Sequence, residues 1–194
     1  MNDKLSIYIK EVLSQNINED RKIILQPLID FIQQKIKDQK SIDLNFICTH
    51  NSRRSHLAQI WAQTASAYFK ISNVNCYSGG TQTTAVFPKI AETLFNSGFN
   101  IWKLNEKENP VYVIKYDENA QSIIGFSKNS FAAIMTCSQA DGGCPFIAGA
   151  EKRIPITFED PKISDGTSEQ TKVYNERSLQ IAAEMFYVFS NINK

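Results

Sequence analysis

The spacing of three reactive side chains, Cys48, Arg54 and Ser55, indicates a loop that could bind and attack an oxyanion. An apolar run ends at Cys48 and an amphipathic pattern begins after Ser55, so we expect the segment to join a buried strand to a helix. Successive backbone N–H groups in such a loop point at one spot, and the helix N-terminus adds partial positive charge, which suits a tetrahedral anion. The predicted anion-binding residues are Thr49, His50, Asn51, Ser52, Arg53, Arg54 and Ser55.

The residue types in this loop suit nucleophilic chemistry. Cys48 lies at its floor, where the same dipoles favour a thiolate and make the sulfur a nucleophile near neutral pH. Arg54 can grip two anion oxygens with its planar guanidinium. We expect Ser55 to cap the helix and to donate a hydrogen bond to the thiolate, and Asn51 to tolerate a left-handed backbone. The alternative is a buried structural thiol beside two solvated arginines.

Two further cysteines, Cys137 and Cys144, lie in a segment that begins where a third predicted strand ends. This end of the strand is at the sheet edge that also carries Cys48. If the residues between them are helical, their Cα atoms are about 10.5 Å apart, beyond the roughly 7 Å limit for a disulfide. A disulfide then requires the segment to unwind, and Gly142 and Gly143 supply flexible backbone. Alternatively, Cys137 packs at the strand end and Cys144 is incidental. Zinc binding is disfavoured because the chain has no Cys-x-x-Cys pair.

The elements that would position these residues alternate between strand and helix. Strands are predicted over residues 42–48, 74–78, 131–136 and 154–157, and helices over 57–68, 90–97 and 173–189. The alternation predicts an α/β fold with a four-stranded parallel sheet and helices on both faces, in which ligands bind beyond the carboxyl ends of the strands. Cys76 lies within the second strand, so we expect it in the core.

Two segments fall outside this alternation. Residues 3–40 carry two helical patterns, which we expect to form an N-terminal helical extension (residues 1–40) packed on the main domain (residues 41–194). Residues 111–116 and 122–126, separated by a turn-like segment, predict an inserted β-hairpin.

Composition excludes several classes of partner. The chain of 194 residues has 21 Lys and Arg against 20 Asp and Glu, so no overall basic field exists to hold nucleic acid. Its apolar runs are far shorter than the roughly 18 residues that span a bilayer, and its first residues lack a signal-peptide core. We expect a cytoplasmic protein with no membrane partner.

Residues 48–55 resemble the signature of the low-molecular-weight protein tyrosine phosphatases, which is Cys, five residues, Arg and Ser after the first strand. The resemblance covers roughly residues 42–192 and includes Asp160 and Pro161, where that family carries its general acid. It implies that Asp160 protonates the leaving oxygen and then activates water. Without the resemblance, Asp160 is an exposed turn aspartate before a proline. His50 stands where a glycine is usual in the family, and Arg53 where a second cysteine is frequent.

The segment from Cys137 to Pro145 looks like the redox segment of the thioredoxin-coupled arsenate reductases, a branch built on the same fold. The resemblance implies that Cys48 attacks arsenate and that Cys137 then attacks Cys48, releasing arsenite. Cys144 next attacks Cys137 and frees Cys48, and thioredoxin or a similar dithiol protein reduces the resulting disulfide. No metal or other cofactor is implied.

The residues after Asp160 bear on the substrate. Residues 162–166 lack the aromatic side chain that lines the cleft of the tyrosine phosphatases, which favours a small inorganic oxyanion over phosphotyrosine. We therefore expect an arsenate reductase. One alternative is a low-molecular-weight phosphatase with a phosphocysteine intermediate, in which Cys137 and Cys144 only protect Cys48 from over-oxidation. Another is a non-catalytic oxyanion-binding or redox-sensing module.

Replacing Arg54 with Lys keeps the positive charge but removes the bidentate fork, so activity towards arsenate and aryl phosphate should fall at least about tenfold. Steady-state rates with both substrates measure the loss. Unchanged turnover would remove Arg54 from the site.

Overall fold

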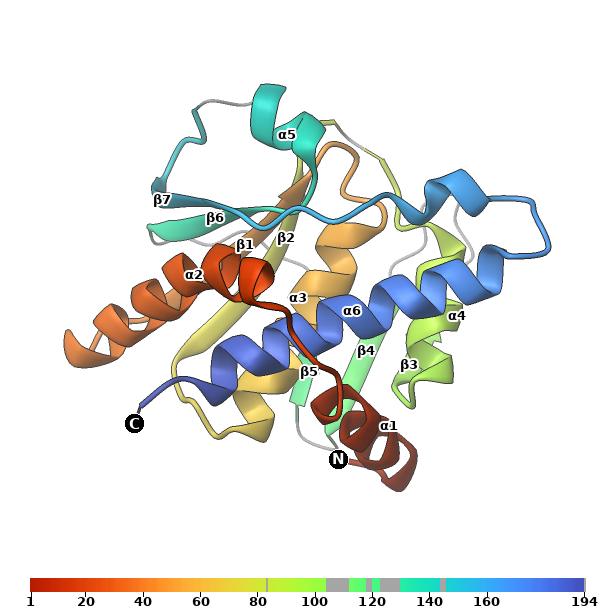
Figure 1. Ribbon diagram of the computed structural model, residues 1–194, viewed down its shortest axis with the longest axis horizontal. Helices are drawn as coiled ribbons and strands as arrows, with labels where there is room; N and C mark the ends of the chain where they lie inside the picture. The colour runs from red at the N-terminus through yellow and green to blue at the C-terminus, as the bar shows by residue number, and fades with distance from the viewer. Residues whose placement is uncertain (83, 104–111, 118–119, 123–129, 144–145, 194) are drawn as a thin grey trace.

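The computed structural model describes residues 1–82, 84–103, 112–117, 120–122, 130–143 and 146–193. Its centre is a four-stranded sheet in the order β2-β1-β6-β7 (Figure 1). The strands are β1 (Ile42–Cys48), β2 (Val74–Gly80), β6 (Phe131–Met135) and β7 (Ala150–Pro155). All three pairings are parallel, which confirms the predicted α/β fold with a four-stranded parallel sheet.

The two central strands are buried on both faces. Every residue of β1 and β6 is buried: β6 is a continuous apolar run, and β1 buries the polar Asp43 and Asn45 together with its apolar residues. Side chains alternate between faces, so Ala132 and Ile134 join the larger hydrophobic cluster while Ala133 and Met135 join a smaller one on the opposite face. The sheet is therefore covered from both sides.

Seven helices surround the sheet in the described part of the chain, and α6 runs across the front of the molecule in Figure 1. The α-helices are α1 (Asp3–Leu13), α2 (Glu19–Lys37), α3 (Arg54–Tyr68), α4 (Pro88–Asn96), α5 (Ser138–Gly143) and α6 (Gln170–Ser190), and the short 3-10 helix η1 covers Pro161–Ser164. Helices α2, α3 and α6 contribute to the larger cluster, whereas Ala140 of α5 joins the smaller one. Helices thus lie on both faces of the sheet.

The two N-terminal helices share the core of the rest of the molecule. Leu5 of α1 and Leu25 of α2 are fully buried in the same cluster as the sheet. Tyr8 stacks on Trp61 of α3, with ring centroids 5.6 Å apart. One continuous hydrophobic core therefore joins residues 1–40 to the sheet domain.

A second, antiparallel sheet contains β3 (Asn100–Lys103), β4 (Tyr112–Asp117) and β5 (Ala120–Ser122). The β4–β5 pair corresponds to the predicted hairpin, although β5 begins before the predicted residue 122. Val111, the turn residues 118–119 and residues 123–126 lie outside the described residues. Strand β3 was not predicted, because four residues are too few to show a strand pattern.

The predicted boundaries of the fourth main strand were wrong. Strand β7 covers Ala150–Pro155 rather than residues 154–157. Its side chains Glu151, Lys152 and Arg153 are exposed, because β7 is an edge strand of the sheet. An edge strand need not be apolar, so the apolar pattern in the sequence marks only the end of β7.

Gly98 follows α4 with a φ of +105°, and a Cβ there would lie 2.5 Å from the backbone nitrogen of Leu5. Gly98→Ala should therefore strain the backbone and push α1 away, lowering the free energy of unfolding by about 2 kcal/mol or more. Gly142→Ala is the matched control, because a Cβ at Gly142 meets nothing within 4 Å. Urea denaturation of both variants measures the difference, and equal losses would contradict it.

Candidate active site

The loop stands where the sequence predicted it. Cys48 is the last residue of β1 and Arg54 the first residue of α3, so the intervening residues link a buried strand to a helix N-terminus. The Cys48 Sγ lies 3.2 Å from the Ser55 Oγ, and the Ser55 hydroxyl donates to the Asn51 Oδ1 at 2.9 Å. A protonated Cys48 can donate a hydrogen bond to the serine oxygen, and a thiolate can instead accept a hydrogen bond from the serine hydroxyl. Ser55 is therefore suited to stabilise the ionised sulfur.

The expectation that Ser55 caps the helix was wrong. The N-cap position of α3 is Arg53, which makes no side-chain cap, and Ser55 is the second helical residue. A helix begins with N–H groups that have no partner within the helix, so the first turn of α3 can serve an anion.

A left-handed residue and a buried histidine shape the turn of the loop. Asn51 has a φ of +43°, as its residue type suggested. Its carbonyl oxygen lies 2.6 Å from the His56 Nε2, and the His56 Nδ1 lies 3.1 Å from the Ser78 Oγ. Burial lowers the pKa of His56 to about 4, so the ring is neutral at neutral pH. Because a carbonyl only accepts, Nε2 carries the proton, and Nδ1 accepts from the Ser78 hydroxyl.

The segment after β2 holds the loop carbonyls. The backbone N–H groups of Gln82 and Phe87 donate to the carbonyls of Thr49 and Ser52 at 2.9 and 3.0 Å, and the Thr84 hydroxyl donates to the carbonyl of His50. In a trans peptide the next N–H points opposite to the carbonyl. The N–H group that comes next in the chain after each of these carbonyls therefore points away from the segment after β2 and towards the inside of the loop.

Gly80 permits the close approach of β2 to the loop. A Cβ at this position would lie 2.7 Å from the Asn51 backbone nitrogen. Sequence analysis did not identify His56, Ser78 or Gly80 as supports of the loop. The only usable signal was the Gly79–Gly80 pair at a strand end, which marks a position where another backbone can approach.

Arg54 is fixed by the segment that follows β7. Its Nη1 donates to the Phe158 carbonyl at 2.8 Å, and its Nη2 lies 2.5 Å from the Asp160 Oδ2. Its Nε is buried and has no hydrogen-bond partner among the described residues. Two nitrogens thus orient the guanidinium, and Nε remains as a donor for an oxyanion. The structure brings Asp160, predicted as a general acid, to this guanidinium.

Arg53 uses its side chain elsewhere. Its Nε donates to the Tyr174 hydroxyl at 2.6 Å, its Nη2 lies 2.6 Å from the Asp165 Oδ2, and its guanidinium stacks 4.1 Å from the centre of the Phe87 ring. The side chain therefore fastens the loop to α6 and to the end of η1. The backbone of Arg53 remains in the loop, where it can contact an anion.

The structure places a second thiol beside the loop. Cys137 follows β6, is 1% exposed and belongs with Cys48 to the smaller hydrophobic cluster. Its Sγ lies 3.5 Å from the Thr49 Oγ1 and accepts the backbone N–H of Ala140 at 3.3 Å. Residues 138–143 form α5, the helical arrangement considered from the sequence. Cys144 lies outside the described residues.

The remaining cysteine is structural. Cys76 is buried in β2, and burial raises the pKa of its thiol. This confirms its predicted place in the core. Among the described residues no three His, Cys, Asp or Glu side chains gather to form a metal site. No helix in the described ranges is both long and apolar enough to cross a membrane.

Known proteins resemble this chain in sequence and fold, although no family model matches it. Arsenate reductase from Staphylococcus aureus (strain Newman) is 33% identical over 141 residues, covering 73% of this chain and 92% of that protein. Arsenate reductase 2 from Staphylococcus epidermidis (strain ATCC 35984) is 31% identical over 124 residues, covering 64% and 80%. The crystal structure of a YwlE mutant from Bacillus subtilis shares the fold, with a TM-score of 0.52 at 17% identity over 77% of this chain and 97% of that one.

A four-stranded parallel sheet with a Cys-x5-Arg-Ser loop after its first strand in the chain is the arrangement that the resemblance to the low-molecular-weight protein tyrosine phosphatases implies, and the YwlE structure shares this fold. The extent of the sequence similarity to the staphylococcal enzymes shows that the chain belongs to the arsenate reductase family.

The neutral, buried His56 should make stability depend on pH. Unfolded His56 takes up a proton below a pKa of 6.5, whereas folded His56 stays neutral until about 4, so the free energy of unfolding falls as pH drops through this window. The difference in pKa corresponds to roughly 3 kcal/mol. In His56→Gln the free energy of unfolding should lose this part of its pH dependence. Urea denaturation at pH 7.5 and at pH 4 measures the difference. His50→Gln is the control and should keep the parent's dependence.

Proposed function

We propose that the protein is a thiol-dependent arsenate reductase. The observation that carries the proposal is the position of Cys137, buried beside Thr49 and therefore next to the nucleophile Cys48. A phosphatase cycle needs no second thiol, because water ends it. A reductase cycle requires one within reach of the first.

In the first step the Cys48 thiolate attacks arsenic, forming a sulfur–arsenic bond and expelling one arsenate oxygen as water. The loop N–H groups and the Arg54 Nε bind the remaining oxygens. Asp160 pairs with Arg54 as a carboxylate 2.5 Å from its Nη2, so it takes up a proton from solvent and then donates that proton to a hydroxyl of arsenate, which leaves as water.

In the second step the Cys137 thiolate attacks the Cys48 sulfur. The sulfur–arsenic bonding pair passes to arsenic, which leaves as arsenite, and a Cys48–Cys137 disulfide forms. The Ala140 N–H and the Thr49 hydroxyl are positioned to stabilise the Cys137 thiolate before it attacks.

In the third step the Cys144 thiolate attacks the Cys137 sulfur, and Cys48 leaves as a thiolate. A thioredoxin-type dithiol protein then supplies the two electrons that reduce the Cys137–Cys144 disulfide. Gly142 and Gly143 support this exchange, because a Cβ at either position would meet nothing within 4 Å, so the end of α5 can rearrange. We place the protein in the cytoplasm, where such reductants keep thiols reduced.

Phosphatase activity is the second candidate. The ion pair between Arg54 and Asp160 supports it, because a phosphocysteine cycle needs only Cys48, Arg54 and a general acid. Residues 162–166 offer no aromatic wall for a phosphotyrosine ring, and Ile163 is 89% exposed, which favours the small oxyanion.

Arsenate-dependent NADPH oxidation in the presence of thioredoxin and its reductase tests the proposal, with phosphate release from an aryl phosphate measured in parallel. Oxidation that requires arsenate and thioredoxin supports the reductase. Phosphate release without such oxidation would show that the protein is a phosphatase. Binding of arsenate without either activity would show that it is a non-catalytic module.

Cys137→Ser and Cys144→Ser should each abolish multiple-turnover arsenate reduction while leaving aryl-phosphate hydrolysis within about threefold of the parent, because hydrolysis uses only Cys48. Cys144→Ser should stop after one turnover with a Cys48–Cys137 disulfide, which peptide mass mapping can detect. Cys76→Ala is the control and should retain reduction. Parent-like reduction by both serine variants would disprove the relay.

A further inference from the structure

Arg21, in the N-terminal helix α2, reaches the segment that carries Asp160. Its Nε and Nη2 donate to Glu184 Oε1 and Oε2 of α6 at 2.9 and 2.5 Å, and its Nη1 donates to the Thr157 carbonyl at 3.3 Å. Its guanidinium also lies 5.2 Å from the centre of the Phe158 ring. One side chain thus joins α2, α6 and the chain that leaves β7.

The same segment orients the catalytic arginine. The Phe158 carbonyl accepts from Arg54, and Asp160 pairs with it. On the sheet side the Phe158 N–H donates to the Thr136 carbonyl at 3.1 Å. On the helical side Arg21 therefore contacts the Thr157 carbonyl and the Phe158 ring, which directly precede the carbonyl and carboxylate that fix Arg54.

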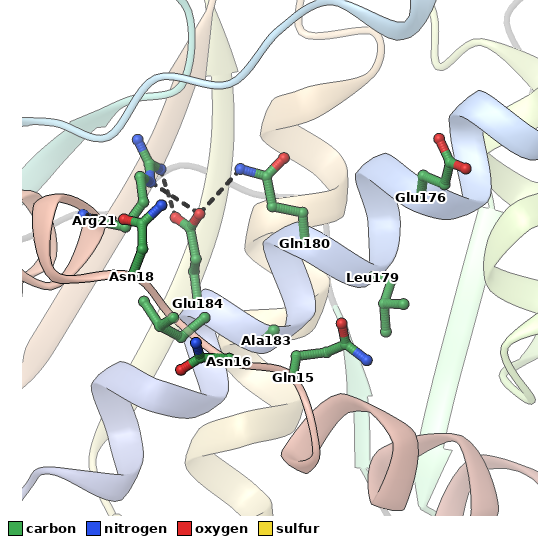
Figure 2. Close-up of a pocket in the computed structure, with 10 residues that line it drawn as sticks. Gln15, Asn16, Asn18, Arg21, Glu176, Leu179, Gln180, Ala183 and Glu184 are labelled. Carbon is green, nitrogen blue, oxygen red and sulfur yellow. Dashed lines mark hydrogen bonds and ion pairs between the residues drawn. The ribbon is translucent and has the colours of Figure 1, made fainter.

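The anchor behind Arg21 is rigid. Glu184 is 1% exposed, and its Oε1 also accepts from the Gln180 amide at 3.1 Å, as Figure 2 shows. A buried carboxylate held on two sides fixes the plane of the guanidinium that it pairs with. Arg21 itself borders a cavity of about 340 Å³ that Asn16 and Leu179 also line (Figure 2).

We infer that Arg21 is a positioning residue for the oxyanion site, which it serves by holding the Thr157–Asp160 segment against Arg54. The inference rests on the proposed use of Arg54 and Asp160 in oxyanion chemistry. When Arg21 is lost, the segment keeps the packing of Phe158 in the core, the Lys162 N–H bond to Asp160 and the Arg177–Glu159 ion pair, but it loses its link to α2 and to the buried Glu184. The guanidinium of Arg54 then samples orientations in which Nε does not face the anion.

The closing experiment compares Arg21→Met with Lys22→Met. The first variant keeps an apolar stem and removes the three hydrogen bonds. The second removes a positive charge from the same turn of α2, where Lys22 pairs with Glu19 rather than with the Asp160 segment. Both variants are measured well below their melting temperatures, so that each sample is folded.

Alkylation of Cys48 by iodoacetate and by iodoacetamide is the readout, quantified on the Cys48 peptide by mass spectrometry. The carboxylate of iodoacetate requires an oriented Arg54, whereas neutral iodoacetamide requires only the thiolate. In Arg21→Met the ratio of the two rates should fall at least about threefold, and kcat for aryl phosphate about tenfold, because misplacement of a catalytic group by a fraction of an ångström is costly. Lys22→Met should match the parent in both.

Free guanidinium at millimolar concentration provides a second measurement, since the cavity beside Arg21 can admit it in Arg21→Ala. Recovery of the alkylation ratio supports the positioning role. An unchanged ratio in Arg21→Met, or equal losses with both reagents, would overturn it. The ratio does not depend on arsenate chemistry, so a parent protein without reductase activity refutes the proposed function and leaves this inference standing if the ratio still falls.

Discussion

The site depends on one property of the peptide unit, namely that its N–H and C=O groups point in opposite directions. Backbone N–H groups can converge on an anion only if the carbonyls of the same loop are bonded on the outside. In this protein Gln82, Thr84 and Phe87 bond those carbonyls, and His56 bonds the carbonyl of the left-handed Asn51. The loop is therefore shaped from outside before any substrate arrives, which is the preorganisation that electrostatic catalysis requires.

A second constraint links the loop to distant parts of the chain. Arg54 stands more than a hundred residues before Phe158 and Asp160 in the sequence, yet its guanidinium bonds to both. The strand order β2-β1-β6-β7 makes this possible, because the chain leaves β7 on the sheet edge where β1 ends. Through Thr157 the same contact extends to Arg21 in α2, so residues outside the phosphatase-like segment take part in orienting the site.

The sequence predicted the elements that carry strong patterns and failed where tertiary context decides. Cys48 and Arg54 were recognisable because a buried strand, a polar loop and an amphipathic helix follow one another along the chain. The environment of Arg53 could not be predicted from the sequence, since its partners Tyr174 and Asp165 lie more than a hundred residues away along the chain. Ser55 has a residue type typical of helix caps, but contact with the Cys48 sulfur determines its position.

The charged residues that hid strand β7 in the sequence protect the edge of the sheet. An edge strand offers unpaired backbone groups that can recruit a strand from another molecule, the first step of aggregation. Glu151, Lys152 and Arg153 project charges along this edge, and two of them are tied down, with Glu151 2.5 Å from the Lys35 Nζ of α2 and Arg153 2.6 Å from Asp141 of α5. A second chain that paired here would have to desolvate or displace these charges, so the edge of the sheet carries its own protection against self-association.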